Sequence, residues 1–299
     1  MALKGAVATI VAVVFWAAPW GGAEPQSDLK GGGRNCLWRV SSSSTAMYIL
    51  GSVHLMKPDA EAFSPVIEEA FEGSDIAVFE VDLGAEGSAE AALFMLSAGA
   101  LPDGSSLSDV VSPETYRLAA DRLGKAGMDI TTMQKMRPWM IATTVALDEL
   151  QRAGYSPTGG VDRHFYSRAV DDGLTIRGLE TVRSQLELFR NLTPAQDEAF
   201  LVQTIKDLDA VIPMADELIG HWRAGRIDEL TELLADGYDE FPDLFTKLVI
   251  DRNRNWMPVL EELLSGSHQA FVVVGALHVV GDGGLAQMLE EKGYRVEQL

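Results

Sequence analysis

Two short segments at opposite ends of the chain follow one design: Met47–His54 reads MYILGSVH, and Phe271–His278 reads FVVVGALH. In each, an apolar run is followed by Gly-x-x-His, and an apolar run of this length that ends in glycine predicts a buried strand. The histidine then comes just past the carboxyl end of its strand, where open α/β sheets form their ligand sites. We therefore expect the two segments to pair in one sheet and their histidines to share one site.

The pairing of these histidines matters more than either alone. A single Gly-x-x-His after a strand is more often a capped or core histidine than a functional one. Here, however, the chain has only five histidines, and His54 and His278 occupy matched positions. Histidine serves both as a metal ligand and as a general base near neutral pH. The matched pair therefore favours a functional role.

Working outward from the first segment, the pattern predicts a hairpin, a helix and a strand. Residues 37–40 and 46–50 are apolar runs around a serine-rich turn, which predicts the hairpin. Pro58 and Asp59 predict the start of a helix that runs to about Glu72. Residues 75–83 predict the next strand, with Glu80 and Asp82 on the same face. Residues 86–155 read as mostly helical, with helix starts at Ser112-Pro113 and near Thr131.

The second half of the chain begins with a predicted helix and a predicted strand and then becomes mostly helical. Residues 159–170 predict a helix and residues 174–179 a strand. A mostly helical segment follows at about 193–265, in which Pro213 should kink or end a helix. Residues 270–293 form the last strand–site–helix unit, and residues 295–299 predict an edge strand. Because the outer segments must pair with each other, we expect one α/β domain over 37–299, with a mixed central sheet, flanking helices and a helical insertion.

The first residues have the pattern of a secretion signal. Lys4 precedes an apolar stretch from Ala6 to Ala18, which is too short to span a bilayer comfortably, and small residues end at Ala23. We expect cleavage after about Ala23, a flexible leader over 24–36, and a periplasmic or secreted protein without a stable membrane span. The alternative is an uncleaved anchor.

Composition limits the class of partner. The chain has 299 residues, of which 47% are hydrophobic, so it can bury a sizeable core. Its 44 acidic and 24 basic residues give a net charge of −20, which argues against nucleic acid and anionic membrane surfaces as partners. The single cysteine, Cys36, cannot form an internal disulfide.

The chemistry must come from residues collected at separate strand ends. The chain has no His-Glu-x-x-His, Gly-x-Ser-x-Gly, Walker loop or paired Cys-x-x-Cys motif. The remaining candidates are His54, His278 and the strand carboxylates Glu80 and Asp82. Two imidazoles and a carboxylate form a recognised arrangement for hydrolytic zinc and other divalent metals. We favour Glu80 as a functional residue over a solvated one, whereas Asp82 either supports a histidine or belongs to a solvated strand face.

Taken together, the motifs resemble the TraB/PrgY/GumN family, most closely its GumN-like branch and more distantly the Tiki-type metalloproteases. The resemblance covers nearly all of residues 37–299. It rests on an ordered set of short motifs: residues 50–54 with Pro58, 79–82, 137–139, 160–162, 178–181 with Gln185, Arg252-Asn253, and 274–281 with Gly284-Leu285.

The resemblance implies a fold like the erythromycin-esterase and ChaN-type proteins, with two pseudo-symmetric halves that each carry a strand–Gly-x-x-His unit. It also implies a divalent-metal peptidase site whose ligands are His54, Glu80 and His278, with Mn, Co or Zn as the metal. Arg252 would face the site and could hold a substrate carboxylate or an oxyanion; the alternative for this residue is a surface ion pair. Glu180 could join the site or stabilise it, whereas Arg137 and Trp139 match packing positions.

The leading interpretation is an exported, metal-dependent hydrolase with a peptide or small-molecule substrate. Its catalytic candidates are Glu80, Arg252 and Glu180. One alternative is a non-catalytic protein that binds a peptide or a metal with the same histidines. Another is an esterase-like hydrolase that uses a histidine base without metal.

Overall fold

The computed structural model describes residues 34–57, 63–86, 88–236 and 242–299. The expected signal peptide and most of the expected leader lie outside these residues. The end of the leader belongs to the core, because Cys36 is 1% exposed and a Cβ on Gly51 would lie 2.6 Å from its Sγ atom. No helix in the described part of the chain is long and apolar enough to cross a membrane.

The core of the protein is a six-stranded mixed sheet in the order β4-β3-β5-β2-β1-β6. Strands β2, β5, β3 and β4 run parallel to one another, whereas β1 is antiparallel to both β2 and β6. The strand bounds are β1 Leu37–Ser41, β2 Ala46–Ser52, β3 Ile76–Phe79, β4 Thr175–Gly178, β5 Ala270–Gly275 and β6 Arg295–Gln298. The expected α/β class, hairpin, edge strand and pairing of the two ends of the chain are thereby confirmed.

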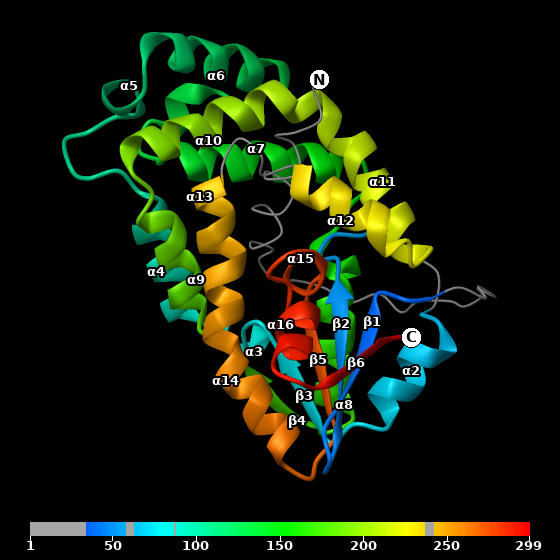
Figure 1. Cartoon of the computed structure of the whole chain (residues 1–299). Coiled ribbons are helices and arrows are strands. Elements are labelled where there is room, and N and C mark those ends of the chain that lie inside the picture. Colours follow the sequence, from blue (N-terminus) through cyan, green and yellow to red (C-terminus); the bar gives the residue numbers. More distant parts are fainter. Residues whose placement is uncertain (1–33, 58–62, 87, 237–241) are drawn as a thin grey trace.

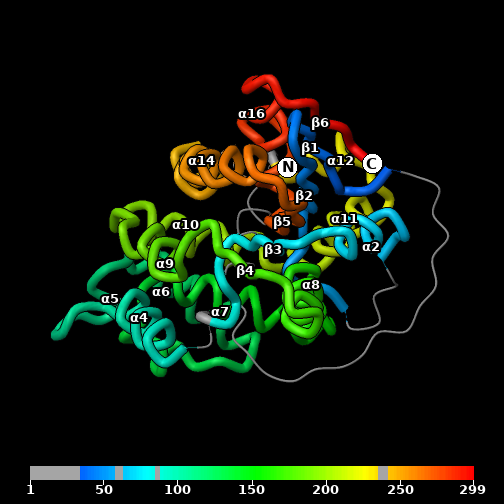
Figure 2. Tube along the Cα trace, turned by 90° about the horizontal axis from the view of Figure 1, so that it is seen from below, coloured from blue at the N-terminus to red at the C-terminus, as the bar shows by residue number. Residues whose placement is uncertain are grey.

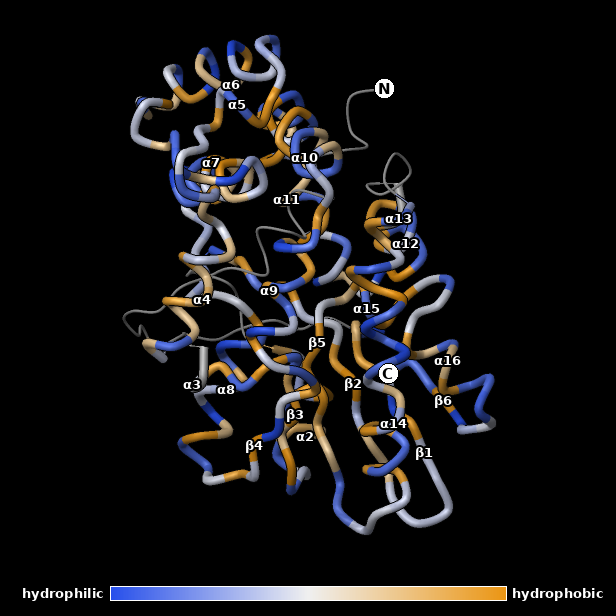
Figure 3. Tube along the Cα trace, turned by 90° about the vertical axis from the view of Figure 1, so that its left-hand side faces the viewer, coloured by the Kyte–Doolittle hydropathy of each residue, from blue (hydrophilic) through white to orange (hydrophobic). Residues whose placement is uncertain are grey.

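Pairing between the two repeated segments is direct. Strand β2 lies parallel to β5 in a register that sets Ser52 opposite Gly275. All six residues of β5 are buried, because this strand lies in the middle of the sheet with helices on both faces, and such strands read as continuous apolar runs. In Figure 3 the apolar colours follow β2, β3 and β5.

Helices account for most of the remaining chain. The α-helices are α2 Pro65–Glu72, α3 Leu83–Glu86, α4 Ala89–Gly99, α5 Leu107–Val110, α6 Pro113–Lys125, α7 Pro138–Arg152, α8 Val161–Asp171, α9 Val182–Arg190, α10 Pro194–Asp207, α11 Val211–Arg223, α12 Ile227–Asp236, α13 Pro242–Phe245, α14 Asp251–Ser265, α15 Ala276–Val279 and α16 Leu285–Glu291. Short 3-10 turns lie at Ile130–Met133, Pro157–Gly159 and Leu208–Ala210, and a π-helical turn, η4, covers Thr246–Ile250.

The helices form two groups around the sheet. Helices α14 and α16 cover one face of the sheet and α2 and α8 cover the other (Figure 2). Helices α5, α6, α7 and α10 lie beyond the end of the sheet toward which β2 points (Figure 1). The site therefore has sheet on one side and a helical layer on the other.

Several element boundaries differ from those expected. The helix expected from Pro58 begins at Pro65; Phe63 and Ser64 are not helical, and residues 58–62 lie outside the described residues. Strand β3 ends at Phe79 rather than near residue 83, because its partner β4 ends at Gly178 and both chains then turn into helices.

Two expected helix signals have local explanations. The start expected near Thr131 is a single 3-10 turn, and the long helix α7 begins at Pro138. The helix that begins at Pro194 ends at Asp207, before Pro213. Pro213 lies in the first turn of α11, where its missing N–H removes no intrahelical hydrogen bond.

Candidate functional site

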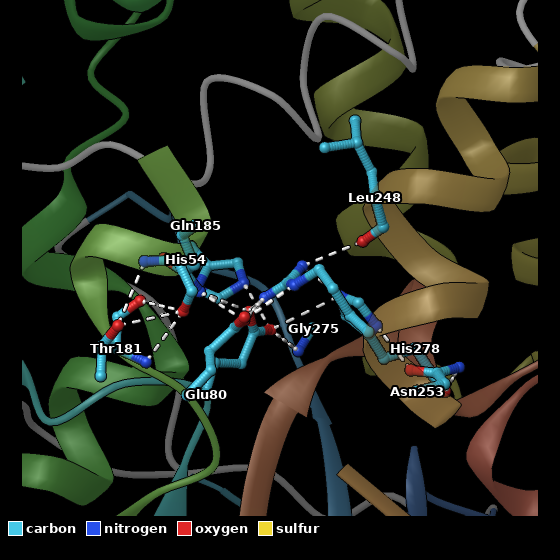
Figure 4. A network of polar contacts seen from close by, with 11 residues as sticks. His54, Glu80, Thr181, Gln185, Leu248, Asn253, Gly275 and His278 are labelled. Carbon is cyan, nitrogen blue, oxygen red and sulfur yellow. Dashed lines mark hydrogen bonds and ion pairs between the residues drawn. The ribbon is translucent and has the colours of Figure 1, made fainter. Parts of the chain in front are cut away.

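Each of the four parallel strands delivers one polar side chain to the site. In sheet order, Glu180 follows β4, Glu80 follows β3, His278 follows β5 and His54 follows β2. Because the carboxyl ends of parallel strands meet at one edge of the sheet, residues that are far apart in sequence converge there (Figure 4). The two Gly-x-x-His histidines and the strand glutamate therefore lie together.

Glu80 is the central acceptor of the site. Its Oε1 atom accepts the Gly275 N–H at 2.8 Å and lies 3.9 Å from Nε2 of both His54 and His278. Its Oε2 atom accepts from Gln185 Nε2 at 3.2 Å and Arg252 Nη2 at 2.5 Å. Burial alone would raise the pKa of this carboxyl, but the charge of Arg252, together with the histidines and the amide, lowers the pKa to about 2. Glu80 is therefore ionised at any working pH.

His278 is buried and held in one protonation state. Its Nε2 accepts from Arg252 Nη1 at 2.8 Å, since a guanidinium can only donate. Its Nδ1–H therefore donates to Asn253 Oδ1 at 2.7 Å, while the Asn253 amide donates to the His278 and Gly283 carbonyls. Burial and the charge of Arg252 lower the pKa of His278 to about 3. His278 is thus a neutral imidazole whose Nε2 lone pair faces the site.

His54 is more accessible and has a charged partner. Its side chain is 15% exposed, and Nδ1 lies 3.1 Å from Asp162 Oδ2 at the start of α8. The loop after β2 can approach α8 this closely because of Gly160, where a Cβ would collide with the His54 carbonyl oxygen. The Val161 N–H also donates to the Val53 carbonyl at 2.9 Å.

Asp82, which we expected to support a histidine, has hydrogen bonds to Tyr166 and Gly84. It accepts from the Tyr166 hydroxyl at 2.6 Å and from the Gly84 N–H at 2.9 Å. The carboxylate beside a histidine is that of Asp162, whose Oδ2 atom lies 3.1 Å from His54 Nδ1.

Arg252, on α14, connects the carboxylates and one imidazole of the site. Its guanidinium makes five hydrogen bonds: Nε and Nη2 to Glu180 Oε1, Nη2 to Glu80 Oε2, and Nη1 to His278 Nε2 and to the Leu248 carbonyl. Arginine has five N–H donors, so each is engaged. Its pKa is raised, because the two carboxylates outweigh the effect of burial. A substrate oxyanion or carboxylate could bind Arg252 only by displacing one of these partners.

Glu180 lies at the outer side of this network. Its Oε1 accepts from Arg252 and from Gln185 Nε2 at 3.2 Å. Its side chain is 13% exposed, and burial raises its pKa in spite of Arg252. Glu180 therefore joins the site through Arg252 and Gln185.

The sequence interpretation assigned no role to Asp162, Gln185, Asn253 or Gly275. All four lie within the quoted motifs, but their partners are visible only once α8, α9 and α14 are placed around the sheet. Gly275 is the least obvious: a Cβ there would lie 3.2 Å from His54 Nε2, 3.3 Å from Glu80 Oε1 and 3.7 Å from His278 Cδ2. Because Gly275 has no side chain, all three groups can lie close to its backbone.

The donor set suits a divalent ion in most respects. Both Nε2 atoms face Glu80 Oε1, and the Nδ1 atom of each histidine contacts an acceptor, which is how metal-binding histidines are usually oriented. Zinc ligands at about 2.1 Å lie about 3.4 Å apart, somewhat closer than the 3.9 Å found here. Among the described residues no three His, Cys, Asp or Glu side chains stand ready to hold an ion. An ion would also compete with Arg252 for His278.

Comparison with known proteins places this site in a family. The model of the TraB/PrgY/gumN family matches residues 36–298. The chain belongs to the TraB/PrgY/gumN family. It is 21% identical over 242 residues to the protein named "Uncharacterized protein YbaP" of Escherichia coli (strain K12), covering 81% of this chain and 87% of that protein. The same values hold for YbaP of Shigella flexneri. No solved structure matches the chain significantly.

The motifs that pointed to this family fall in two places. Those with His54, Glu80, Asp162, Arg252 and His278 form the site. The motif at residues 137–139 lies elsewhere: Arg137 Nε donates to Asp197 Oδ2 at 2.8 Å, and the Trp139 N–H donates to Asp197 Oδ1 at 2.6 Å. This motif joins the start of α7 to α10 and is structural.

Proposed function

We propose that this protein is a divalent-metal-dependent hydrolase that cleaves peptide bonds. The observation that carries the proposal is the arrangement of His54 Nε2, His278 Nε2 and Glu80 Oε1 close to the backbone of Gly275. Imidazole nitrogens with one carboxylate oxygen suit Zn²⁺, Mn²⁺ or Co²⁺. These three side chains would hold the metal, and a bound ion would supply acidified water and polarise the scissile carbonyl.

The remaining residues have definite tasks in this proposal. Asp162 and Asn253 hold the two imidazoles so that Nε2 faces the site. Arg252 keeps Glu80 ionised and in place. When an ion binds, Arg252 must give up His278 and keep Glu80 and Glu180. One donor of Nη1 is then released, and that donor is the group that could bind a substrate oxygen.

The experiment is metal content and peptide cleavage of the purified chain, with Mn²⁺, Co²⁺ and Zn²⁺ added back after chelation. His54→Ala and His278→Ala should each abolish metal-dependent cleavage, and Glu80→Gln should lower metal affinity. Arg252→Lys should reduce turnover more than metal binding, because lysine lacks the planar fork. His268→Ala is the control, since His268 is 69% exposed and lies by Asp75. Normal metal binding and cleavage in both histidine variants would contradict the proposal.

A metal-independent hydrolase is a second candidate, supported by one contact. Arg252 Nη1 already donates to the His278 Nε2 lone pair at 2.8 Å, while His54, held by Asp162, has the orientation of a general base. Cleavage that persists after chelation, is lost in His54→Ala and survives in His278→Gln would favour this candidate. Metal or peptide binding without turnover would instead indicate a binding protein.

Export completes the proposal. Its support is the sequence pattern alone: Lys4, the apolar stretch Ala6–Ala18 and the small residues that end at Ala23. N-terminal sequencing of protein recovered from periplasm or medium should find a chain that starts near Glu24. A cytoplasmic protein that begins at Met1 would contradict export without affecting the hydrolase proposal.

A further inference from the structure

Ser52, the last residue of β2, carries a buried hydroxyl group that has no hydrogen-bond partner among the described residues. The residue is 3% exposed, and its Oγ atom makes no hydrogen bond in this part of the chain. Burying a hydroxyl without a partner costs free energy, so such a group needs an explanation. The second Gly-x-x-His unit has Ala276 at the same motif position, and Ala276 is 5% exposed. The motif itself therefore does not require a hydroxyl at this position.

The register of the sheet directs Ser52 toward the candidate site. Ser52 pairs with Gly275 of β5, and paired residues of parallel strands point to the same face of the sheet, about 4.8 Å apart. A Cβ on Gly275 would lie 3.2 Å from His54 Nε2 and 3.3 Å from Glu80 Oε1. Figure 4 shows these groups meeting beside Gly275. The Ser52 side chain therefore points to the same side of the sheet, one strand spacing away.

The neighbouring hydrogen-bond donors are already engaged within the protein. The Gly275 N–H and the Gln185 amide both donate to Glu80. The N–H groups of Arg252 donate to two carboxylates, an imidazole and a backbone carbonyl. Ser52 differs from these donors, because its O–H group is not used by any described acceptor. A small ligand beside Glu80 could accept from Ser52 without breaking an existing contact.

We propose that the Ser52 hydroxyl donates a hydrogen bond to the attacking water and holds it beside His54 Nε2. This inference rests on the proposed hydrolase function. Burial favours a water over the substrate as the acceptor, because Ser52 is 3% exposed, as is His278, and Glu80 is 7% exposed. A negatively charged oxygen accepts a stronger hydrogen bond than neutral water does. The hydroxyl therefore favours the nucleophilic, deprotonated form of that water.

Fluoride tests this contact without turnover, because it is a small anion that accepts hydrogen bonds and replaces water on bound metal ions. The chelated chain is loaded with Co²⁺, and fluoride is titrated while the visible absorption of the cobalt is recorded. Ser52→Ala should weaken fluoride binding by about tenfold or more, since it removes a hydrogen bond to an anion. Affinity for Co²⁺ should be unchanged. Peptide cleavage by the same variant should fall by roughly 100-fold.

Ser74 provides the matched control. It is also a buried serine, 9% exposed, but its hydroxyl donates to the Ala70 carbonyl at 2.8 Å. It precedes β3 and so lies at the opposite edge of the sheet from the site. Ser74→Ala should lower the urea midpoint of unfolding and leave fluoride binding and cleavage unchanged. Ser52→Ala should show the reverse: its urea midpoint, measured without metal, should stay the same or rise, because alanine removes a hydroxyl without a partner.

The outcomes separate this inference from the proposed function. A wild type that binds no Co²⁺ contradicts both. A wild type that binds Co²⁺ but cleaves no peptide contradicts the proposed function, and the fluoride comparison still decides whether Ser52 contacts the bound ligand. Unchanged fluoride binding or unchanged cleavage in Ser52→Ala, beside an active wild type, overturns this inference alone. A lower urea midpoint in Ser52→Ala also overturns it, because the hydroxyl would then be bonded within the protein.

Discussion

The two Gly-x-x-His units share a motif, but their histidines have different surroundings. His54 is 15% exposed and contacts a carboxylate, Asp162. His278 is 4% exposed, and its partners are the neutral Asn253 and the cationic Arg252. The β2 unit places its histidine where solvent can reach it, whereas the β5 unit places its histidine in a closed network. Equal motifs therefore do not imply equal roles, because the partners come from helices outside the repeat.

Removing Arg252 should disrupt the closed network around His278, and we expect this substitution to have the largest effect on stability. In Arg252→Met, Glu80 and Glu180 lose their shared cation while buried, and such a loss costs about 3–5 kcal/mol of the free energy of unfolding. Urea denaturation measures it. Arg254→Met is the control, since Arg254 is 64% exposed and pairs only with Asp251, and it should cost less than about 1 kcal/mol. A loss that small in Arg252→Met would show that the network does not stabilise the fold.

Acid should destabilise the protein through the β5 unit. The pKa of His278 is lowered to about 3 in the folded chain, so the unfolded chain binds a proton first as the pH falls. Because of this group, the free energy of unfolding should fall by about 1.4 kcal/mol per pH unit between about pH 6.5 and pH 3, and it should not change above about pH 6.5. Glu80, with its pKa lowered to about 2, adds a second loss between pH 4.5 and pH 2.

Chelated protein, unfolded in urea at a series of pH values, provides the measurement. The slope between pH 6.5 and 4.5 should persist in His54→Gln and become clearly smaller in His278→Gln, where the part that comes from His164, whose pKa burial also lowers, remains. If both variants keep the slope, His278 is not the group responsible.

Substitutions of Asn253 and Asp162, the partners of the two histidines, should test the difference between the two Gly-x-x-His units. Asn253→Asp removes the two N–H donors to the His278 and Gly283 carbonyls and adds a buried negative charge, so we expect a loss of about 2–4 kcal/mol. Asp162→Asn keeps an acceptor for His54 at a position that is 14% exposed. It should cost less than about 1 kcal/mol but reduce activity or metal affinity about 10–100-fold. Equal destabilisation by both substitutions would contradict the proposed asymmetry.

A smaller loss of stability than in Asn253→Asp should come from Gly275→Ala. The new methyl group would contact His54 Nε2 at 3.2 Å and Glu80 Oε1 at 3.3 Å, which should cost about 1–3 kcal/mol of the free energy of unfolding. Metal binding and cleavage should fall sharply if the reacting groups meet at this point. Gly124→Ala is the control: Gly124 lies in α6 with nothing within 4 Å of an added Cβ. It should stabilise the chain by about 0.5–1 kcal/mol. Unchanged metal binding and cleavage in Gly275→Ala would place the chemistry elsewhere.

Local patterns predicted most of the fold. The apolar runs at residues 47–50 and 271–274 identified the parallel pair of strands, and Ser112 with Pro113 identified the start of α6. Boundaries such as the end of β3 at Phe79 were predicted poorly, because a strand ends where its partner ends and the partner lies almost a hundred residues away. The helix expected from Pro58 shows the same limit, since turn residues indicate a break but not the residue at which a helix resumes.

For the site, the sequence by itself determined which groups stand at the strand ends. Strand periodicity places His54, Glu80 and His278 at one edge of a parallel sheet, and the family resemblance added Glu180 and Arg252. Only the tertiary structure decided what each group does there. It set Asp162 against one imidazole and Asn253 against the other, and it used every donor of Arg252 within the network. The reason is physical: burial and partners determine protonation and availability, and both arise from helices whose positions no local pattern encodes.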